Sequence, residues 1–90
     1  MLFAIRAYDK NNGLEKLEVI ETIDFTEAVE YAEDLSNDII KYSNLLESEG
    51  QSDVEYKVYP LDDSTFVSID RLNYLYKSNY EEFLKKYRKR

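Results

Sequence analysis

Carboxylates and tyrosine hydroxyls are the groups with which this 90-residue chain could do chemistry, because the sequence contains no histidine and no cysteine. It therefore lacks an imidazole base, a thiolate nucleophile and the nitrogen and sulfur ligands of ordinary zinc sites. Asp62 and Asp63 form a carboxylate pair, but the sequence PLDDS around them is typical of a turn. Two glycines leave no material for a glycine-rich phosphate loop. We expect a protein that is not an enzyme and has no catalytic residue, metal or cofactor.

A second set of carboxylates occupies the segment from Asp24 to Asp38, which has six acids and no base. Four of these acids recur at helical steps of three and four and form one stripe: Glu27, Glu30, Asp34 and Asp38. Glu33 lies beside the stripe. Like charges at this spacing cost about 0.2–0.5 kcal/mol per pair. The helix dipole offsets that cost by about 0.3–1 kcal/mol each for Asp24 and Glu27, but its effect fades beyond the first turn. The later acids are therefore either a solvated face or a binding surface.

An acidic ridge on a helix suits a partner with a basic surface. Proteins that bind nucleic acid carry basic grooves that attract phosphates. Carboxylates on a rigid helix can occupy such a groove, and electrostatic steering speeds their association. The residues that we expect to bind this partner are Glu27, Glu30, Glu33, Asp34 and Asp38, the neighbouring Tyr31, and Asp62 and Asp63 if the fold brings them to the same side. The same charge disfavours direct binding of nucleic acid by the acidic body.

Nine tyrosines and four phenylalanines give the chain a high aromatic content. Tyr31, Tyr74 and Tyr80 fall outside or at the margin of the periodic apolar positions. Exposed tyrosine is common in protein interfaces because it contributes a large contact area at low entropic cost. In a small domain, tyrosine also fills a core while its hydroxyl stays in water. The sequence leaves both interpretations open.

Charge is divided unevenly along the chain. Residues 1–70 hold 17 acids and 5 bases, a net charge of −12, whereas residues 71–90 hold 2 acids and 7 bases, a net charge of +5. The basic end, LKKYRKR, is typical of a solvated helix end whose cations complement the dipole. It could also fold back on the acidic helix or contact phosphate or an anionic membrane surface.

The sequence shows neither a signal peptide nor an apolar stretch approaching the roughly 18 residues that a membrane span needs. The absence of cysteine fits a reducing compartment. We expect a cytoplasmic protein, in the host cytoplasm if it is phage-encoded, with no membrane partner.

Two strands and a helix are expected to position the acidic stripe. Residues 2–8 and 14–23 alternate as strands, and Asn12-Gly13 between them favours a hairpin with a type I′ turn. Asp24 and Glu27 then form a capping box, and apolar positions at steps of three and four predict a helix over about 25–48, with Gly50 as its stop. The small residues Ala28 and Ala32 allow a close approach of this helix to a sheet.

The second half of the chain predicts one strand and helical segments. Residues 54–59 alternate as a strand that Pro60 ends or marks as an edge. The run TFVSI is a candidate fourth strand, and a helical pattern starts at Asp70. A second capping box, Ser78 with Glu81 or Asn79 with Glu82, favours two short helices over one kinked helix.

The order ββαβ(β)α predicts one α+β domain over residues 1–90. We expect a small two-layer fold with a mainly antiparallel sheet of three or four strands, the long helix across one face and a C-terminal helical segment. A crossover through the long helix leaves a partly mixed sheet open.

Two resemblances accompany these patterns. The strand, turn and strand followed by TEAVEYAED resemble the HicB-like antitoxin fold over residues 2–34, and no residue role is carried over from it. In size, acidity, tyrosine content and lack of cysteine and histidine, the chain is similar to small phage-encoded inhibitors, including anti-CRISPR proteins that mimic nucleic acid. The latter resemblance implies an inhibitor of a nucleic-acid-handling protein.

Two hypotheses follow from the sequence. The first is a non-enzymatic protein that binds and inhibits a nucleic-acid-handling partner through the acidic helix face. The second is a structural or regulatory small protein, such as an antitoxin-like module or an oligomer subunit, a homodimer included. In that second case the acidic face is only solvated and the Tyr-rich C-terminal segment makes the contacts.

Overall fold

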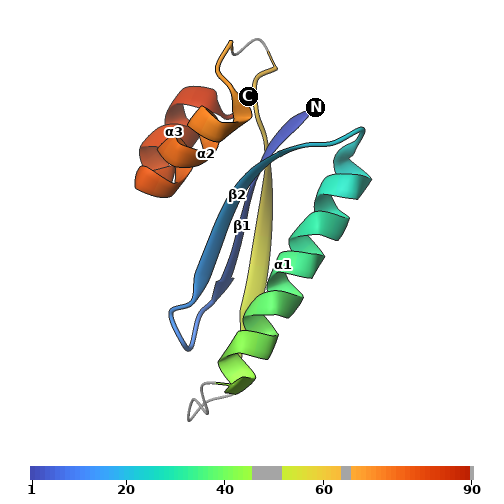
Figure 1. The fold of residues 1–90 in the computed structure, drawn as a ribbon, viewed down its shortest axis with the longest axis vertical. Coiled ribbons are helices and arrows are strands. Elements are labelled where there is room, and N and C mark those ends of the chain that lie inside the picture. The colour runs from blue at the N-terminus through green and yellow to red at the C-terminus, as the bar shows by residue number, and fades with distance from the viewer. Residues whose placement is uncertain (46–51, 64–65, 90) are drawn as a thin grey trace.

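The computed structural model describes residues 1–45, 52–63 and 66–89. The elements are the strands β1 (Leu2–Asp9), β2 (Glu15–Glu21) and β3 (Val54–Pro60), and the helices α1 (Phe25–Leu45), α2 (Ile69–Ser78) and α3 (Tyr80–Tyr87). They form the small α+β fold that the sequence predicts, with the sheet and α1 as its two principal layers (Figure 1).

The sheet has three strands in the order β2-β1-β3, and β1 pairs antiparallel with both neighbours. Helix α1 therefore returns the chain to the far side of β1 in the antiparallel direction, and the described sheet is not mixed. Pro60 ends β3, which is an edge strand. A proline is tolerated there because an edge position does not need its missing N–H for the ladder.

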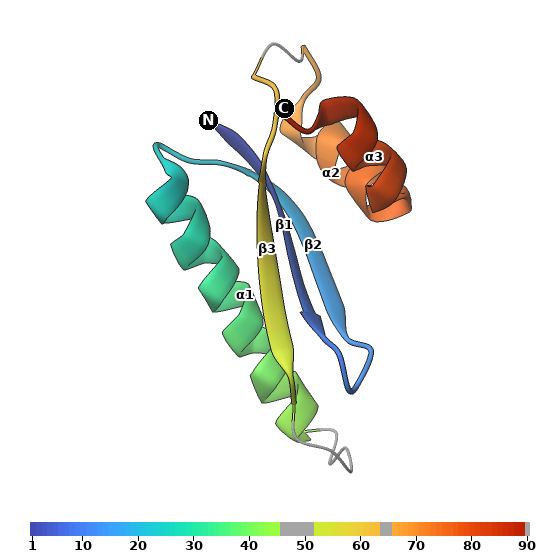
Figure 2. The same ribbon diagram turned by 180° about the vertical axis from the view of Figure 1, so that it is seen from behind.

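Helices cover both faces of the central strand β1. The ring of Phe3 lies 6.0 Å from that of Phe25, and Ser43 donates a hydrogen bond to Asp9 at 2.9 Å, so α1 runs along the full length of one face. Helices α2 and α3 pack on the opposite face near the start of β1 (Figure 2). As a consequence, Ala4 and Ile5 are both buried although they point to opposite sides of the sheet.

The main hydrophobic cluster lies between the sheet and the two C-terminal helices. Its buried members are Ala4, Val19, Leu61, Leu72, Tyr76 and Phe83. The ring of Tyr76 contacts those of Phe83 and Tyr80 at centroid distances of 5.1 and 6.5 Å. Its buried hydroxyl has no hydrogen-bond partner among the described residues. Burial raises the pKa of Tyr76 well above its ordinary value.

Replacing Tyr76 with phenylalanine tests the cost of this hydroxyl. Tyr76→Phe keeps the ring contacts and removes an unsatisfied polar group, so we expect the free energy of unfolding to rise by about 1 kcal/mol. Urea denaturation followed by circular dichroism measures the change. A loss of stability would show that the hydroxyl is hydrogen-bonded in solution. Tyr74→Phe, at a ring that is 62% exposed, is the matched control and should leave stability unchanged.

The predicted cap of α1 at Asp24 is confirmed, and the return bond of Glu27 goes to the residue before the cap and not to Asp24. Asp24 Oδ1 accepts the N–H of Glu27 at 2.9 Å, and Glu27 Oε2 accepts the N–H of Ile23 at 3.0 Å. Ala28 and Ala32 are fully buried on the inner side of the helix. The predicted end of the helix near Ser48 and its stop at Gly50 lie outside the described residues.

The C-terminal segment forms two helices, as predicted. Asn79 separates them and caps α3, because its side chain accepts the N–H of Glu82 at 3.3 Å. Of the two predicted cap residues, Asn79 is therefore the one used, but the box is incomplete because the Asn79 N–H donates to Leu75 O at 3.1 Å and not to Glu82. The candidate fourth strand is absent over residues 66–68, where Ser68 instead caps α2 by accepting the N–H of Arg71.

The hairpin between β1 and β2 is confirmed, but its turn is longer than a two-residue type I′ turn. Asp9 N–H donates to Leu14 O at 2.8 Å, which leaves Lys10 to Gly13 in the loop. Gly13 has a φ of 70°, the left-handed conformation that a residue without a Cβ adopts at least cost. The longer loop brings the backbone N–H groups of Asn11 and Asn12 to the side chain of Asp9.

The carboxylate of Asp9 joins three segments at the end of the sheet where β1 ends and β3 begins. It is 2% exposed and accepts backbone N–H groups of Asn11 and Asn12 in the hairpin loop at 3.0 and 3.3 Å. It also accepts the Asn12 side-chain amide at 2.8 Å, the Ser43 hydroxyl at 2.9 Å and the Asp53 N–H at 3.2 Å. Burial alone would raise the pKa of Asp9, but these hydrogen bonds outweigh it and hold the pKa far below its usual range.

The depressed pKa makes Asp9 a pH-dependent source of stability. The ionised carboxylate stabilises the fold fully above the ordinary Asp pKa of about 3.9, and this contribution is lost as the pH falls toward the folded-state pKa. Asp9→Asn places an amide donor among five donors, so we expect its Tm to lie several degrees below that of the native protein at pH 7. The difference in Tm between the native protein and Asp9→Asn should become steadily smaller as the pH falls below about 4.

Asp53→Asn is the matched control, since only the backbone N–H of Asp53 enters the network. It should change Tm little at either pH. A gap between the native protein and Asp9→Asn that stays constant from pH 7 to low pH would contradict the role of the ionised carboxylate.

Candidate functional site

The outer face of α1 carries the predicted acidic stripe. The residues that the helix buries against the sheet are Ala28, Ala32, Ser36, Ile39 and Ser43. On the side away from them lie Glu27, Glu30, Asp34 and Asp38, all exposed. The helix has five acids and one base, Lys41. The structure thus brings these four predicted residues together on one surface.

Two of the four carboxylates have partners within the molecule. Glu27 accepts the N–H of Ile23, the residue before the cap of α1. Asp38 Oδ2 lies 3.7 Å from Lys16 Nζ of β2, and because this ion pair is exposed it contributes little to stability. Glu30 and Asp34 have no hydrogen-bond or ion-pair partner in residues 1–45, 52–63 and 66–89. The unpaired charge of the stripe is therefore centred on Glu30 and Asp34.

Tyr31 and Glu33 flank the stripe on opposite sides. Tyr31 is 39% exposed on the β2 side of the helix, where burial, followed by the charges of Glu18 and Asp38, raises the pKa of its hydroxyl. Glu33 is exposed on the side of the helix that faces β3. A partner that covers Glu30 and Asp34 can reach Tyr31 or Glu33, but a flat surface does not reach both.

The structure does not bring Asp62 and Asp63 onto the acidic stripe. Both follow β3 in the segment that leads to α2. Asp63 Oδ1 accepts the N–H of Leu2 at 3.0 Å, and the Asp62 N–H donates to Tyr87 O at 2.9 Å. They lie at the start of β1 and the end of α3, away from the outer face of α1. Asp63 therefore has a structural contact that sequence reasoning did not foresee.

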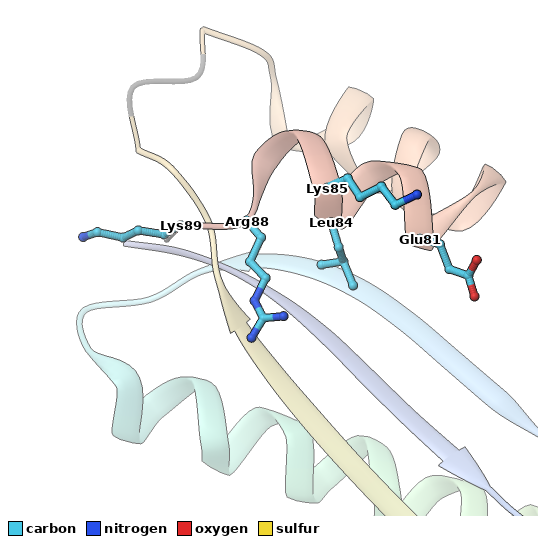
Figure 3. A pocket seen from close by; sticks show the side chains of 5 residues that line it. All are labelled: Glu81, Leu84, Lys85, Arg88 and Lys89. Atoms are coloured by element: carbon cyan, nitrogen blue, oxygen red, sulfur yellow. The ribbon is translucent and has the colours of Figure 1, made fainter.

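The basic C-terminal segment lies on the other side of the sheet from α1 (Figures 1 and 2). Glu81, Leu84, Lys85, Arg88 and Lys89 line a hollow there (Figure 3). The guanidinium of Arg88 lies 4.9 Å from the ring centre of Tyr59, and Lys89 N–H donates to Pro60 O at 2.8 Å. Residues 87–89 are thus tied to the end of β3 and do not fold back on the acidic helix.

Sequence reasoning missed a cluster centred on Arg6. Its guanidinium lies 4.1 Å from the ring centre of Tyr8 and 4.8 Å from that of Tyr80, and its Nε donates to Glu15 at 2.7 Å. The Tyr8 hydroxyl in turn donates to Glu55 at 2.7 Å. The alternation of β1 places Arg6 and Tyr8 on one face, which was the available signal. The cluster holds α3 against the sheet, and its groups are paired with one another.

Within the described residues, no group of three acidic side chains is arranged to hold a metal ion. No described helix is long and apolar enough to cross a membrane. Comparison of the chain with protein-family models, with curated proteins and with solved structures finds no match.

Proposed function

We propose that the protein is a small non-enzymatic inhibitor that binds a nucleic-acid-handling protein through the outer face of α1. The observation that carries this proposal is the exposed stripe on α1, in which Glu30 and Asp34 have no partner among the described residues. The partner is a protein with a basic groove. We also propose that it is an inhibitor of the phage-encoded type, similar to anti-CRISPR proteins that mimic nucleic acid.

The spacing of the stripe suits a groove built for phosphates. At 1.5 Å per residue, steps of three and four residues separate successive carboxylates by about 4.5–6 Å along the helix. The four acids from Glu27 to Asp38 span about 17 Å. Phosphates of one DNA strand follow each other at about 3.4 Å along the duplex axis. The helix thus presents a linear array of negative charge on a similar scale.

The alternative, a structural or regulatory protein that binds through its C-terminal tyrosines, has less exposed material. Tyr76 is fully buried and Tyr80 and Tyr87 are half-buried in the hydrophobic cluster. Tyr74, at 62% exposure, is the tyrosine of α2 and α3 that is available to a partner. Tyr74→Ala is therefore the variant that tests this alternative.

Charge reversal at the centre of the stripe tests the proposal. The immobilised native protein is used to capture proteins from a bacterial host lysate, and the captured protein is then purified. We expect Glu30→Lys/Asp34→Lys to weaken its binding at least tenfold, which is about 1.4 kcal/mol. Affinity should also fall steeply with ionic strength, because exposed charges are screened. Fluorescence anisotropy with a labelled oligonucleotide should show that the native protein displaces nucleic acid from the partner.

Glu21→Lys/Glu81→Lys is the matched control, because it changes the net charge equally at exposed positions away from the outer face of α1. It should leave the affinity within about twofold of the native value, since a distant surface charge acts mainly on the association rate. Three results would contradict the proposal. The first is that Glu30→Lys/Asp34→Lys binds the partner as tightly as the native protein does. The second is that the native protein does not displace nucleic acid, and the third is that Tyr74→Ala alone strongly weakens binding.

A further inference from the structure

The outer side of β3 is an unpaired strand edge. Leu61 N–H donates to Leu2 O, which fixes the alternation of the ladder between β1 and β3. Glu55, Lys57 and Tyr59 direct their backbone groups toward β1, and the residues between them direct theirs outward. Val54, Tyr56 and Val58 therefore present backbone N–H and C=O groups to the outside. None of these groups has a partner among the described residues.

The two edges of the sheet differ. On β2, the side chain of Asn73 accepts the N–H of Val19 at 2.6 Å and donates to its carbonyl at 3.0 Å. That amide occupies the place of a neighbouring strand and interrupts the β2 edge. On β3, Lys89 N–H pairs with Pro60 O at one end, and the outward backbone groups of Val54, Tyr56 and Val58 stay open among the described residues. A further strand can therefore pair with β3, whereas on β2 the side chain of Asn73 blocks such pairing.

We propose that a second copy of this chain pairs with the β3 edge, antiparallel and with Tyr56 opposite Tyr56 on the two-fold axis. This register uses only the open residues. It gives three hydrogen-bonded residue pairs, which exchange about six backbone hydrogen bonds. The two three-stranded sheets become one six-stranded sheet. The proposal does not depend on the inhibitory function proposed above.

The side chains of β3 are complementary to themselves in this register. On the α1 face, Val54 lies opposite Val58, and Tyr56, which is 39% exposed, lies opposite its own copy. On the other face, Glu55 lies opposite Lys57 twice, and opposite charges at directly facing positions stabilise a strand pair. Lys57 has no carboxylate partner among the described residues, and its neighbour on β1 is Arg6. The second copy brings a carboxylate directly opposite Lys57, one that Tyr8 and Lys10 of its own chain also contact.

The position of α1 also fits this pairing. The helix packs mainly over β1 and β3 and less over β2. With strands about 4.8 Å apart, the axis of α1 lies about 5 Å from the two-fold axis, so the two copies of α1 lie about 10 Å apart. Packed helices are separated by about 8–10 Å. Ile40, which is 36% exposed on the side of α1 toward β3, then faces the partner helix.

The contacts of α1 with β1 give the level at which the two-fold axis meets the helix. Phe25 lies at the level of Phe3, and Ser43 at the level of Asp9. Tyr56 pairs with Ala7, about two-thirds of the way between these contacts, so its level on α1 is near residue 37. A two-fold axis there brings the two helices antiparallel, with their positions near residue 37 at the same level.

A charge-swap experiment tests the register. Glu55→Lys and Lys57→Glu are made as separate full-length variants, and sedimentation velocity measures the dimer dissociation constant of each. Each variant faces its own copy with like charges, so we expect dimerisation to weaken about tenfold in each case. In an equimolar mixture the two variants face each other with opposite charges at both positions. The mixture should recover a dimer at least as tight as that of the native protein.

A proline scan provides a second, independent measurement. Tyr56→Pro removes an outward N–H at the centre of the edge without removing a bond to β1, so the variant should fold, by circular dichroism, and sediment as a monomer. Glu21→Pro, at an exposed outward position on β2, is the matched control and should keep the native dimer. A native protein that sediments as a monomer at its highest soluble concentration would overturn the proposal. So would a dimer that Tyr56→Pro leaves intact, or a mixture of the charge variants that stays monomeric.

Discussion

A single buried carboxylate fixes how the layers of this protein meet. Asp9 accepts hydrogen bonds from the β1–β2 loop, from Ser43 of α1 and from the backbone just before β3. Three connections that are distant in sequence thus end on one side chain. Because the charge is compensated by five donors and is excluded from water, the far end of α1 and the start of β3 must both reach the same point. This contact places one end of α1 on the sheet, and the contact of Phe25 with Phe3 places the other, so the two together set the direction of the helix.

Local chemistry predicted the elements well. Glu27 and Asp24 mark the start of α1, Ala28 and Ala32 mark its buried side, and Asn79 marks the break between the last two helices. Each of these features acts within a few residues of chain, so a sequence pattern contains the whole interaction. The same holds for the two strands of the hairpin, which alternation predicted, whereas the length of its loop was not predicted. The acidic stripe was also predictable, since helical spacing alone places its members on one surface.

Contacts between distant segments were not predictable in the same way. Nothing near Asp9 in the sequence indicates that Ser43 and the Asp53 N–H converge on it, and nothing near Asn73 indicates that it will bond to Val19. The position of Asp62 and Asp63 relative to α1 likewise depends on which face of the sheet the last two helices cover. Because both faces of β1 are apolar, the last two helices could cover either face of the sheet. Packing over the whole domain decides which face they cover.

The arrangement of charge across the sheet has a consequence for how the molecule behaves in an electric field. The acids of α1 lie on one side, and Lys85, Arg88 and Lys89 lie on the other. The two sets are separated by the thickness of the sheet, so the molecule has a permanent electric moment that points across its layers. In the field of another charged body such a molecule experiences a torque as well as a net force. Such a torque turns the molecule toward one orientation relative to the charged body.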